Sequence, residues 1–205
     1  MIGKLKHTYH LYGLLGCFSL LSQVIYTKLF FKTARLIRRP FDIRGKKHIY
    51  FSKGFTSGRY CRIEAHSLNK FQGNIIEFGV NCQINDSVHI AAAEKISFGD
   101  NVLIASRVFI TDLNHGSYKG QIHSHPDTIC RERELQANPV RIDDNVWLGE
   151  GVVVLPGVKI GKSSIIGANS VVTRSIPAYS IAAGNPAKII KQFDFQRNEW
   201  VNVNG

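Results

Sequence analysis

The feature that most constrains this chain is a six-residue period in its apolar residues. From Phe78 to Val108 an apolar residue stands at every sixth position, and a second series is offset from the first by two positions. Both series return between Val140 and Val172, and a glycine or alanine directly follows several members of the second series. Since an α-helix repeats about every 3.6 residues and a strand about every two, neither element explains a period of six.

A chain that turns a corner every six residues would produce this pattern. Three short strands then form one coil of a triangular prism, and successive coils stack as parallel strands. One apolar side chain of each strand points into the prism, while glycine or another small residue fits at the corner. We therefore predict an all-β solenoid, a parallel β-helix over residues 48–192, between an N-terminal segment over residues 1–47 and a C-terminal tail over residues 193–205.

The phase of the repeat predicts one long interruption. Ile110 and Ile142 occupy equivalent positions but are 32 residues apart, which is five periods and two extra residues. A loop over residues 112–139 must therefore project from the prism. This loop is polar and contains three of the eight histidines, His115, His123 and His125. A long polar loop on a rigid solenoid is a candidate functional site.

The N-terminal segment carries most of the positive charge. The formal net charge is +11, and residues 1–47 contribute +9 of it through ten basic residues and one acid. An apolar run over residues 11–31 lies in the same segment, and no small-residue cleavage site follows it, so we expect no cleavable signal peptide. We interpret the run as an interfacial helix whose Lys and Arg side chains meet anionic lipid headgroups. A helix that packs on its own domain or on a neighbouring subunit, and a membrane span, remain alternatives.

The composition argues against several other chemistries. The four cysteines lie far apart in the sequence, so we expect free thiols in a reducing compartment. They are Cys17, Cys61, Cys82 and Cys130. His123 and His125 form an HxH pair without a third ligand at a supporting spacing, so we expect no metal. The basic residues lie on an apolar segment and belong to no nucleic-acid-binding motif, so we expect no nucleic-acid partner.

Four residues stand out as candidates for chemistry. His115 lies just beyond the last inward position before the loop, where a neutral imidazole can accept a proton from a hydroxyl group. Asn85 and Asp86 follow an inward position, at a corner from which they could face His115 along the prism axis. Trp147 should point outward, as a ligand platform or an interface residue. Spacing alone leaves a structural alternative open for three of them. His115 is equally consistent with an ordinary loop histidine, and Asn85 and Asp86 with a solvated turn.

Two long runs resemble a known family. VWLGEGVVVLPGVKIGKSSIIGANSVVTRSIPAYSIAAGNPAKII and FGDNVLIASRVFITDLNHG resemble the hexapeptide-repeat acyltransferases, notably the galactoside and maltose O-acetyltransferase branch. The whole chain, including GFTSG and INDSVHIAA, is more similar still to bacterial O-acetyltransferases of lipopolysaccharide O-antigen and capsule assembly. The resemblance covers roughly residues 35–193. It implies a left-handed parallel β-helix and a homotrimer with active sites between neighbouring subunits.

The resemblance also implies roles for individual residues. It makes His115 the general base that deprotonates the acceptor hydroxyl, and Asn85 a residue that contacts the substrate beside it. It implies that acetyl-CoA is the co-substrate, with a backbone N–H near the thioester stabilising the oxyanion. The residues it assigns to acetyl-CoA are Trp147, Gly149 and Glu150 at the thioester, Ala168, Thr173 and Arg174 along the pantetheine arm and nucleotide, and Lys188 and Lys191 at the phosphates. Glu150 departs from the galactoside branch, which has a small hydroxyl residue there.

These observations lead to one preferred function and three alternatives. We expect an O-acetyltransferase that acts on a saccharide hydroxyl of a lipid-linked acceptor. It would work in the cytoplasm, at the inner face of the membrane, during the assembly of surface polysaccharide. A cytosolic acetyltransferase of small sugars or xenobiotics would share the fold but would not need the basic N-terminus. A non-catalytic scaffold would have lost the histidine or the acetyl-CoA motif. A carbonic anhydrase of this fold needs three histidines, and only His89 and His115 lie on suitable coils.

Overall fold

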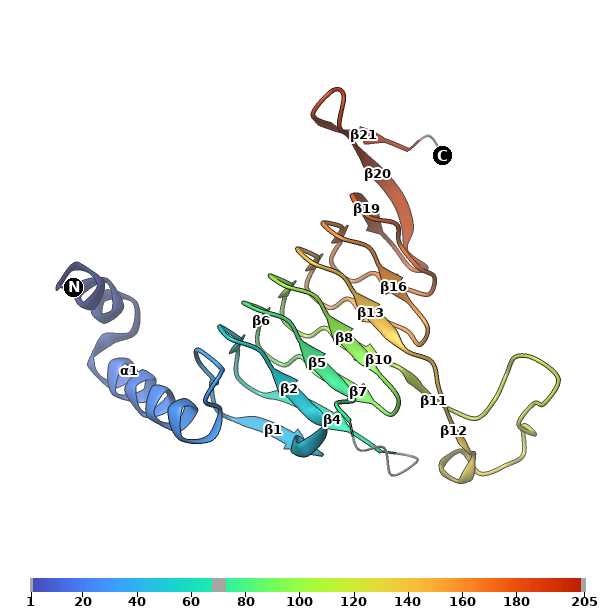
Figure 1. The fold of residues 1–205 in the computed structure, drawn as a ribbon, viewed down its shortest axis with the longest axis horizontal. Coiled ribbons are helices and arrows are strands. Elements are labelled where there is room, and N and C mark those ends of the chain that lie inside the picture. Colours follow the sequence, from blue (N-terminus) through green and yellow to red (C-terminus); the bar gives the residue numbers. More distant parts are fainter. Residues whose placement is uncertain (1, 68–72, 204–205) are drawn as a thin grey trace.

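The computed structural model describes residues 2–67 and 73–203, and the chain winds into a stack of three-sided coils (Figure 1). Each coil passes through sheet A, sheet B and sheet C in turn. Sheet B contains β1 (Phe41–Arg44), β4 (Cys61–Ala65), β7 (His89–Ala92), β10 (Phe109–Thr111), β15 (Val153–Val154) and β18 (Val171–Val172). Sheet C contains β2 (Ile49–Phe51), β5 (Ile76–Phe78), β8 (Ile96–Phe98), β13 (Val140–Ile142) and β16 (Lys159–Ile160).

In the described residues sheet A has eight strands, of which six are parallel and the last two are added by antiparallel pairing. The parallel part contains β3 (Thr56–Ser57), β6 (Gln83–Ile84), β9 (Leu103–Ile104), β14 (Trp147–Leu148), β17 (Ile165–Ile166) and β19 (Ser180–Ala183). The antiparallel strands β20 (Lys188–Asp194) and β21 (Glu199–Asn202) follow β19 and extend the sheet at the C-terminal end.

The inward positions predicted from the six-residue period form the core. Every member of both apolar series is buried. Residues at equivalent positions stack in columns because parallel pairing places them in register, as in Ile90, Ile110 and Val154 of sheet B. In sheet C the rings of Phe78 and Phe98 stack with centroids 4.5 Å apart and planes within 1° of parallel.

The corners between sheets C and A show how the chain turns. Asn81, Asn101 and Asn145 occupy successive coils with positive φ angles, a conformation that asparagine tolerates better than most residues. Their side-chain amides form a ladder, since Asn81 donates to Asn101 at 3.4 Å and Asn101 donates to Asn145 at 3.3 Å. At Gly99 a Cβ atom would lie 2.3 Å from the Asp144 carboxylate, so only glycine allows the coils to approach this closely.

The solenoid extends beyond both boundaries that we predicted. The first coil begins before residue 48, because Leu36 bridges to Thr56 and β1 pairs with β4 in sheet B. The six-residue period is present here at Ile37, Ile43, Ile49 and Phe55, but it is out of phase with the series that begins at Phe78, so we did not extend the solenoid to this coil. At the other end β20 crosses residue 192 and pairs with β19 and β21, so residues 193–194 and 199–202 of the predicted tail belong to sheet A. Antiparallel strands have no six-residue repeat that would reveal them.

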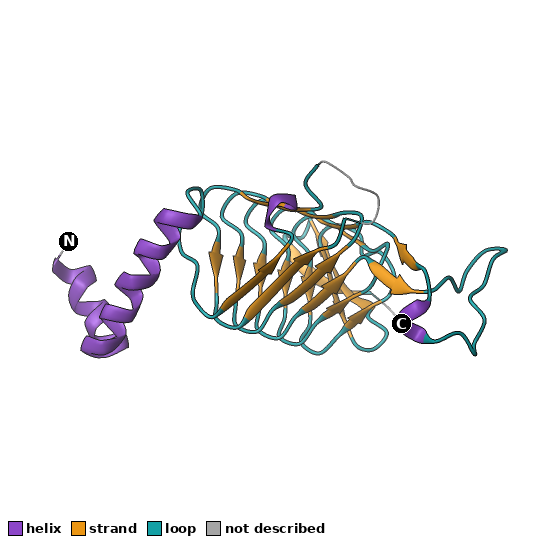
Figure 2. Cartoon of the chain, turned by 90° about the horizontal axis from the view of Figure 1, so that it is seen from below, coloured by secondary structure: helices purple, strands orange, loops and turns teal. Residues whose placement is uncertain are grey.

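The residues predicted to leave the prism form a hairpin and a long loop. β11 (Leu113–His115) follows β10 directly and pairs antiparallel with β12 (Leu135–Ala137). Residues 116–134 join the two strands and include a short 3₁₀ helix over Cys130–Glu132. Figure 2 shows this arm extending from the stack, at the opposite end of the view from the N-terminal helix.

The N-terminal segment forms the helix α1 (Ile2–Phe30), which Gly13 interrupts with a φ of 62°. The part after Gly13 packs on the first coil, where Thr27 is fully buried and Phe31 lies against Phe51. The Thr27 hydroxyl accepts the Ile37 N–H at 2.8 Å. The helix thereby covers the open end of the solenoid, where backbone groups would otherwise lack a neighbouring coil.

Candidate active site

His115 lies at the end of β11, on the hairpin that projects from the corner between sheets B and C. Its side chain is exposed, and its backbone pairs with Leu135 across the hairpin. The His115 carbonyl accepts the Tyr118 hydroxyl at 2.5 Å, and Tyr118 in turn accepts Arg133 at 2.7 Å. Among the described residues, no side chain forms a hydrogen bond with the imidazole itself. The ring is therefore held through its backbone and can meet a ligand from solvent.

Asp112 fastens this hairpin to the solenoid, and sequence analysis did not single it out. Its side chain is fully buried, and its carboxylate accepts three backbone N–H groups, from Ala93 at 2.7 Å, Glu94 at 2.9 Å and Lys95 at 2.8 Å. Its carbonyl accepts the Asn138 N–H at 2.7 Å, which closes the base of the loop. The only sequence feature that marks Asp112 is its position, two residues after Ile110, the last inward residue before the loop.

Asn85 and Asp86 lie at a different corner from His115. They follow β6 at the corner between sheets A and B, so within one chain they do not face His115 along the prism axis, and that expectation is wrong. The Asn85 side-chain oxygen accepts an N–H of Gln83 at 3.0 Å. Asp86 accepts the Arg59 N–H at 2.6 Å, which is the role of a turn residue that ties one coil to the next.

The residues assigned to the thioester lie on the same corner as Asn85, two coils further on. Trp147 points outward from β14 and is 48% exposed. A Cβ atom at Gly149 would lie 2.7 Å from the Ala168 nitrogen, so glycine is required there. The Glu150 carboxylate pairs with Arg107 of the preceding coil, which gives this side chain a structural partner.

The backbone amides of this turn are not equally free. The Gly149 N–H donates to Ile166 at 2.8 Å, and the Gly151 N–H donates to Ser106 at 2.9 Å. Within the described residues the Glu150 N–H has no backbone acceptor, so it is the amide of this turn that can donate to an oxyanion. The N–H of Glu150, rather than its carboxylate, is therefore the chemically useful group.

The other residues assigned to acetyl-CoA divide between two regions of the chain. Ala168 lies at the corner between sheets A and B, one coil beyond Gly149. Thr173 and Arg174 follow β18 at the corner between sheets B and C, the corner that carries the His115 hairpin. Lys188 and Lys191 lie on β20, in the antiparallel part of sheet A. One chain therefore does not bring all of these residues together.

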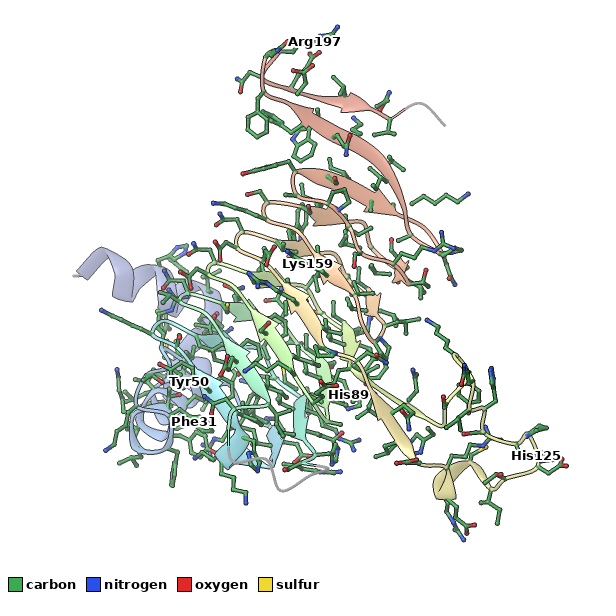
Figure 3. All side chains as sticks on the ribbon, turned by 45° about the vertical axis from the view of Figure 1, so that its right-hand side comes forward. Phe31, Tyr50, His89, His125, Lys159 and Arg197 are labelled. Carbon is green, nitrogen blue, oxygen red and sulfur yellow. The ribbon has the colours of Figure 1, made fainter. Side chains whose placement is uncertain are left out.

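The remaining loop histidines do not form a metal site. His123 bonds to the Gly120 carbonyl at 3.0 Å, and His125 lies 3.6 Å from the Asp127 carboxylate. Figure 3 shows His125 at the outer end of the projecting arm, far from His89 on the stack of coils. In residues 2–67 and 73–203, no three His, Cys, Asp or Glu side chains are grouped to hold a metal ion.

The cysteines do not supply a nucleophile from the core. Burial raises the pKa of the Cys61 and Cys82 thiols to about 11, so both are protonated at neutral pH. All four cysteines are free thiols, as the sequence predicts.

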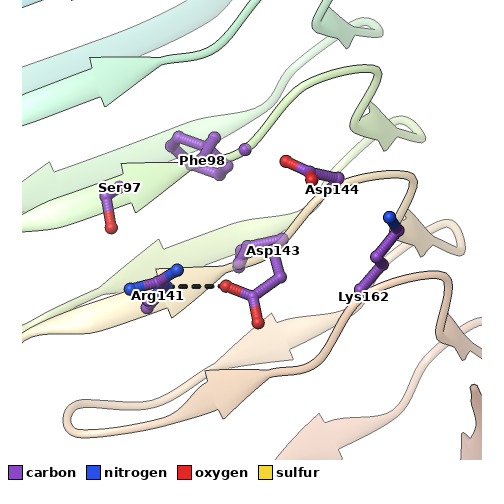
Figure 4. A pocket seen from close by; sticks show the side chains of 8 residues that line it. Ser97, Phe98, Arg141, Asp143, Asp144 and Lys162 are labelled. Carbon is purple, nitrogen blue, oxygen red and sulfur yellow. Dashed lines mark hydrogen bonds and ion pairs between the residues drawn. The ribbon is translucent and has the colours of Figure 1, made fainter. Parts of the chain in front are cut away.

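A hollow on sheet C contains none of the predicted site residues. It has a volume of about 400 Å³ and is lined by Ser97, Phe98, Arg141, Asp144 and neighbouring residues (Figure 4). Arg141 there bonds to Asp143 at 2.6 Å. Two acids and two bases line this hollow, so it has no marked preference for an ion of either sign.

A buried carboxylate on sheet B is a second feature that sequence analysis missed. Glu64 is 4% exposed, and it contacts Arg44 at 2.8 Å, Arg62 at 2.7 Å and His89 at 2.9 Å. Burial raises the pKa of Glu64, but hydrogen bonds from Arg62 and His89 and the charges of Arg62 and Arg44 outweigh it, so the pKa lies below its ordinary value. Arg62 lies two residues from Glu64 on β4, whereas Arg44 and His89 come from the neighbouring strands β1 and β7 and reach Glu64 only when the coils stack.

Comparison with known proteins identifies the family to which this fold belongs. Residues 139–174 match the family model for the bacterial transferase hexapeptide (six repeats). Over 190 residues, the chain is 45% identical to "Putative lipopolysaccharide biosynthesis O-acetyl transferase WbbJ" of Escherichia coli (strain K12), covering 92% of this chain and 94% of that protein. The chain therefore belongs to the hexapeptide-repeat acyltransferase family, and it is an acyltransferase.

Two solved structures of the same kind carry the predicted co-substrate or its product. A galactoside acetyltransferase in complex with coenzyme A matches with a TM-score of 0.51 and 29% identity, over 74% of each chain. The hexapeptide-repeat acetyltransferase VCA0836 of Vibrio cholerae O1 biovar eltor, complexed with acetyl-CoA, matches with a TM-score of 0.52 and 26% identity. That match covers 75% of this chain and 71% of the other.

We expect Asp112→Ala to loosen the hairpin that carries His115. The substitution leaves three N–H groups without an acceptor, one of them buried and two part-buried, and a buried group alone costs about 1–3 kcal/mol. Trypsin should then cut the loop at Arg131 and Arg133 faster than it cuts wild type, in native buffer. Asp127→Ala, at an exposed acid of the same loop, is the control. Equal cutting rates in all three proteins would contradict the anchoring role.

We expect Glu64 to make stability depend on acid pH. Because its pKa is lower in the folded than in the unfolded state, Glu64 stabilises the fold above its unfolded pKa of about 4.3. This contribution falls as the pH drops through the folded pKa. The difference in unfolding free energy between wild type and Glu64→Gln, measured in urea from pH 7 to pH 3, should therefore shrink below about pH 4.3. A constant difference would show that Glu64 does not titrate as described.

Proposed function

We propose that this chain transfers the acetyl group of acetyl-CoA to a sugar hydroxyl during assembly of a cell-surface polysaccharide, O-antigen or capsule. The observation that carries the proposal is the 45% identity to the WbbJ protein over nearly the full length of both chains. That relative is described as acting in lipopolysaccharide biosynthesis. We further infer that the coils have the left-handed sense that the family resemblance implies.

In the proposed reaction, His115 accepts the proton of the acceptor hydroxyl through its neutral imidazole. The hydroxyl oxygen attacks the thioester carbonyl, and the Glu150 N–H donates to the oxyanion that forms. The tetrahedral intermediate collapses, the carbon–sulfur bond breaks, and coenzyme A leaves as a thiolate that takes the proton from His115. The products are the acetylated sugar and free coenzyme A, and no metal is needed to balance the step.

The proposed active site requires more than one copy of the chain. His115 and the residues Asn85, Trp147 and Glu150 lie at different corners of the same prism, so a neighbouring chain must bring its own corner to His115. A homotrimer meets this requirement, since each corner between sheets A and B then faces the hairpin of another subunit. The acyl donor and acceptor would meet between two subunits.

We expect His115→Ala to lower kcat by a factor of about 10² or more with little change in the affinity for coenzyme A. The measurement is acetyl-CoA-dependent release of free thiol with a panel of saccharides, and coenzyme A binding is measured separately. His125→Ala, at an exposed histidine of the same arm, should retain wild-type turnover. Turnover by His115→Ala equal to wild type would remove the base assignment. No thiol release by wild type with any acceptor would count against the proposed reaction.

We also propose that the enzyme binds peripherally to the inner face of the membrane through α1. Polar Gln23 and Thr27 of this helix are buried against the coils, which is unusual for a helix of a soluble domain. Apolar side chains face outward on its other side, and they are Leu14, Phe18, Leu21, Ile25 and Leu29. Lys28 and Lys32 are exposed beside them, as anionic headgroups require.

The packing of α1 favours surface binding over a span. Residues Tyr9–Phe30 are long and apolar enough to cross a membrane by length and composition. However, Gln23 and Thr27 hold one side of the helix against the first coil, and a spanning helix would have to leave that contact. The charged side chains of Lys4 and Lys6 lie outside the described residues.

The triple substitution Phe18→Ser, Leu21→Ser and Ile25→Ser should abolish binding to vesicles. These side chains are each more than half exposed, so the change removes apolar area without opening the core. Co-flotation with vesicles of phosphatidylglycerol and phosphatidylethanolamine provides the measurement. Ile122→Ser with Ile129→Ser, at exposed apolar residues of the projecting arm, is the matched control. Equal flotation of the triple variant and wild type would exclude α1 as the membrane contact.

A further inference from the structure

A hollow lies between α1 and the outer face of sheet A, and no role has been assigned to it. Its volume is about 440 Å³, within the range of small-molecule sites. One wall is apolar and comes from Leu20 and Val24 of α1. The other wall comes from β3 and β6 and includes Thr56 and Gln83. Asn85, the residue expected to contact the acceptor, also lines the hollow.

Two arginines make the hollow suitable for an anion. Arg35 and Arg38 both line it, and their backbones are fixed, since Arg35 N–H donates to Phe55 at 2.8 Å and Arg38 N–H donates to Ser57 at 3.1 Å. Among the residues that the structure describes, no acidic side chain lines the hollow. Guanidinium groups bind phosphate oxygens through paired N–H donors. The charge therefore favours phosphate groups over a neutral sugar alone.

A buried hydroxyl in the same hollow lacks a partner. The Oγ1 atom of Thr56 is buried and forms no hydrogen bond within the described part of the chain. Thr56 is 93% buried, and a buried hydroxyl without a partner is costly in free energy. Because this oxygen is covered within the fold, a ligand in the hollow would reach it only after a covering side chain moved aside.

The position of the hollow relates it to the proposed acetyl donor site. Along sheet A the strands follow the order β3, β6, β9 and β14, so the hollow lies on the α1 side of Asn85 and Trp147 lies on the other side. A ligand in the hollow would reach Asn85 from the N-terminal end of the solenoid, while acetyl-CoA would approach from the C-terminal end. The two substrates would not compete for space.

We propose that this hollow binds the diphosphate and the first apolar units of a saccharide acceptor carried on a lipid diphosphate. Arg35 and Arg38 hold the diphosphate, Leu20 and Val24 contact the lipid, and the attached sugar extends to Asn85. A nucleoside diphosphate sugar shares the diphosphate, but the apolar wall from α1 and the exposed apolar face of that helix favour the lipid. This assignment names the acceptor class of the proposed acetyl transfer and rests on that function.

Titration calorimetry of the full chain with three soluble probes tests the site. Geranyl diphosphate, inorganic pyrophosphate and uridine diphosphate are each titrated into wild type and into Arg35→Gln/Arg38→Gln. We expect wild type to bind geranyl diphosphate about tenfold more tightly than either other probe, and the double variant to lose about tenfold or more of that affinity. Arg35→Lys/Arg38→Lys keeps the charge without the paired donors, and it should show a smaller loss.

A control variant that loses the same number of positive charges elsewhere distinguishes binding in the hollow from a general effect of net charge. Arg141→Gln/Lys162→Gln removes two positive charges from the hollow on sheet C (Figure 4) and should bind geranyl diphosphate as wild type does. Equal affinity of Arg35→Gln/Arg38→Gln and this control would overturn the proposal. Binding of uridine diphosphate as tight as that of geranyl diphosphate would overturn the lipid assignment.

The titration also keeps this proposal separate from the proposed function. It uses no acetyl-CoA, so absence of acetyl transfer in the thiol-release assay would leave its result unaffected. Conversely, the enzyme could transfer acetyl to free saccharides while Arg35→Gln/Arg38→Gln keeps its affinity for geranyl diphosphate. That result would support the proposed transferase activity and contradict the proposed role of the hollow.

Discussion

Parallel pairing between successive coils is the interaction on which the rest of this structure depends. Each strand donates and accepts backbone hydrogen bonds with the strands of the coils before and after it, so residues one coil apart must stand in register. The same register creates the columns of Ile90, Ile110 and Val154 and the stacked rings of Phe78 and Phe98. A coil at either end lacks a neighbour, which explains why α1 covers one end and antiparallel strands extend the other.

The same constraint determines where function can be placed. A strand of two or three residues cannot vary without disturbing its neighbours, but the corners can carry extra residues at little cost. The corner between sheets B and C carries the hairpin with His115, and Asp112 replaces the lost ladder contacts at its base with three hydrogen bonds. The corner between sheets A and B instead carries Asn85 and Glu150, two coils apart. The candidate catalytic groups therefore lie on separate edges of a rigid prism.

The N-terminal helix packs on the first coil, beside the proposed acceptor site. Polar Gln23 and Thr27 are buried on the first coil, while large apolar side chains on the opposite side are exposed, which is unusual in a water-soluble domain. The helix also supplies the apolar wall of the hollow that contains Arg35, Arg38 and Asn85. One element thus packs on the first coil, carries the apolar surface that we propose binds lipid, and borders a cavity beside the proposed acceptor site.

The sequence by itself determined the coil, the inward residues and the long interruption. Ile84, Ile104 and Val152 could be placed in the core from their spacing alone, because a six-residue period has one structural explanation. The family resemblance identified His115, since a loop histidine has no periodicity of its own. The first coil was missed because its six-residue period, at Ile37, Ile43, Ile49 and Phe55, is out of phase with the later series, and the antiparallel end was missed because its pairing has no such signal.

Only the tertiary structure decided which residues meet. Glu64 with Arg44 and His89, Glu150 with Arg107, and Asp112 with the amides of residues 93–95 are separated in sequence by about one coil or more. The structure also placed Asn85 and His115 at different corners, against the simplest expectation from spacing. The physical reason is that the six-residue period specifies only how far along the prism a residue lies. Contacts across corners and coils depend instead on the length of each turn and on the loop inserted between β10 and β13.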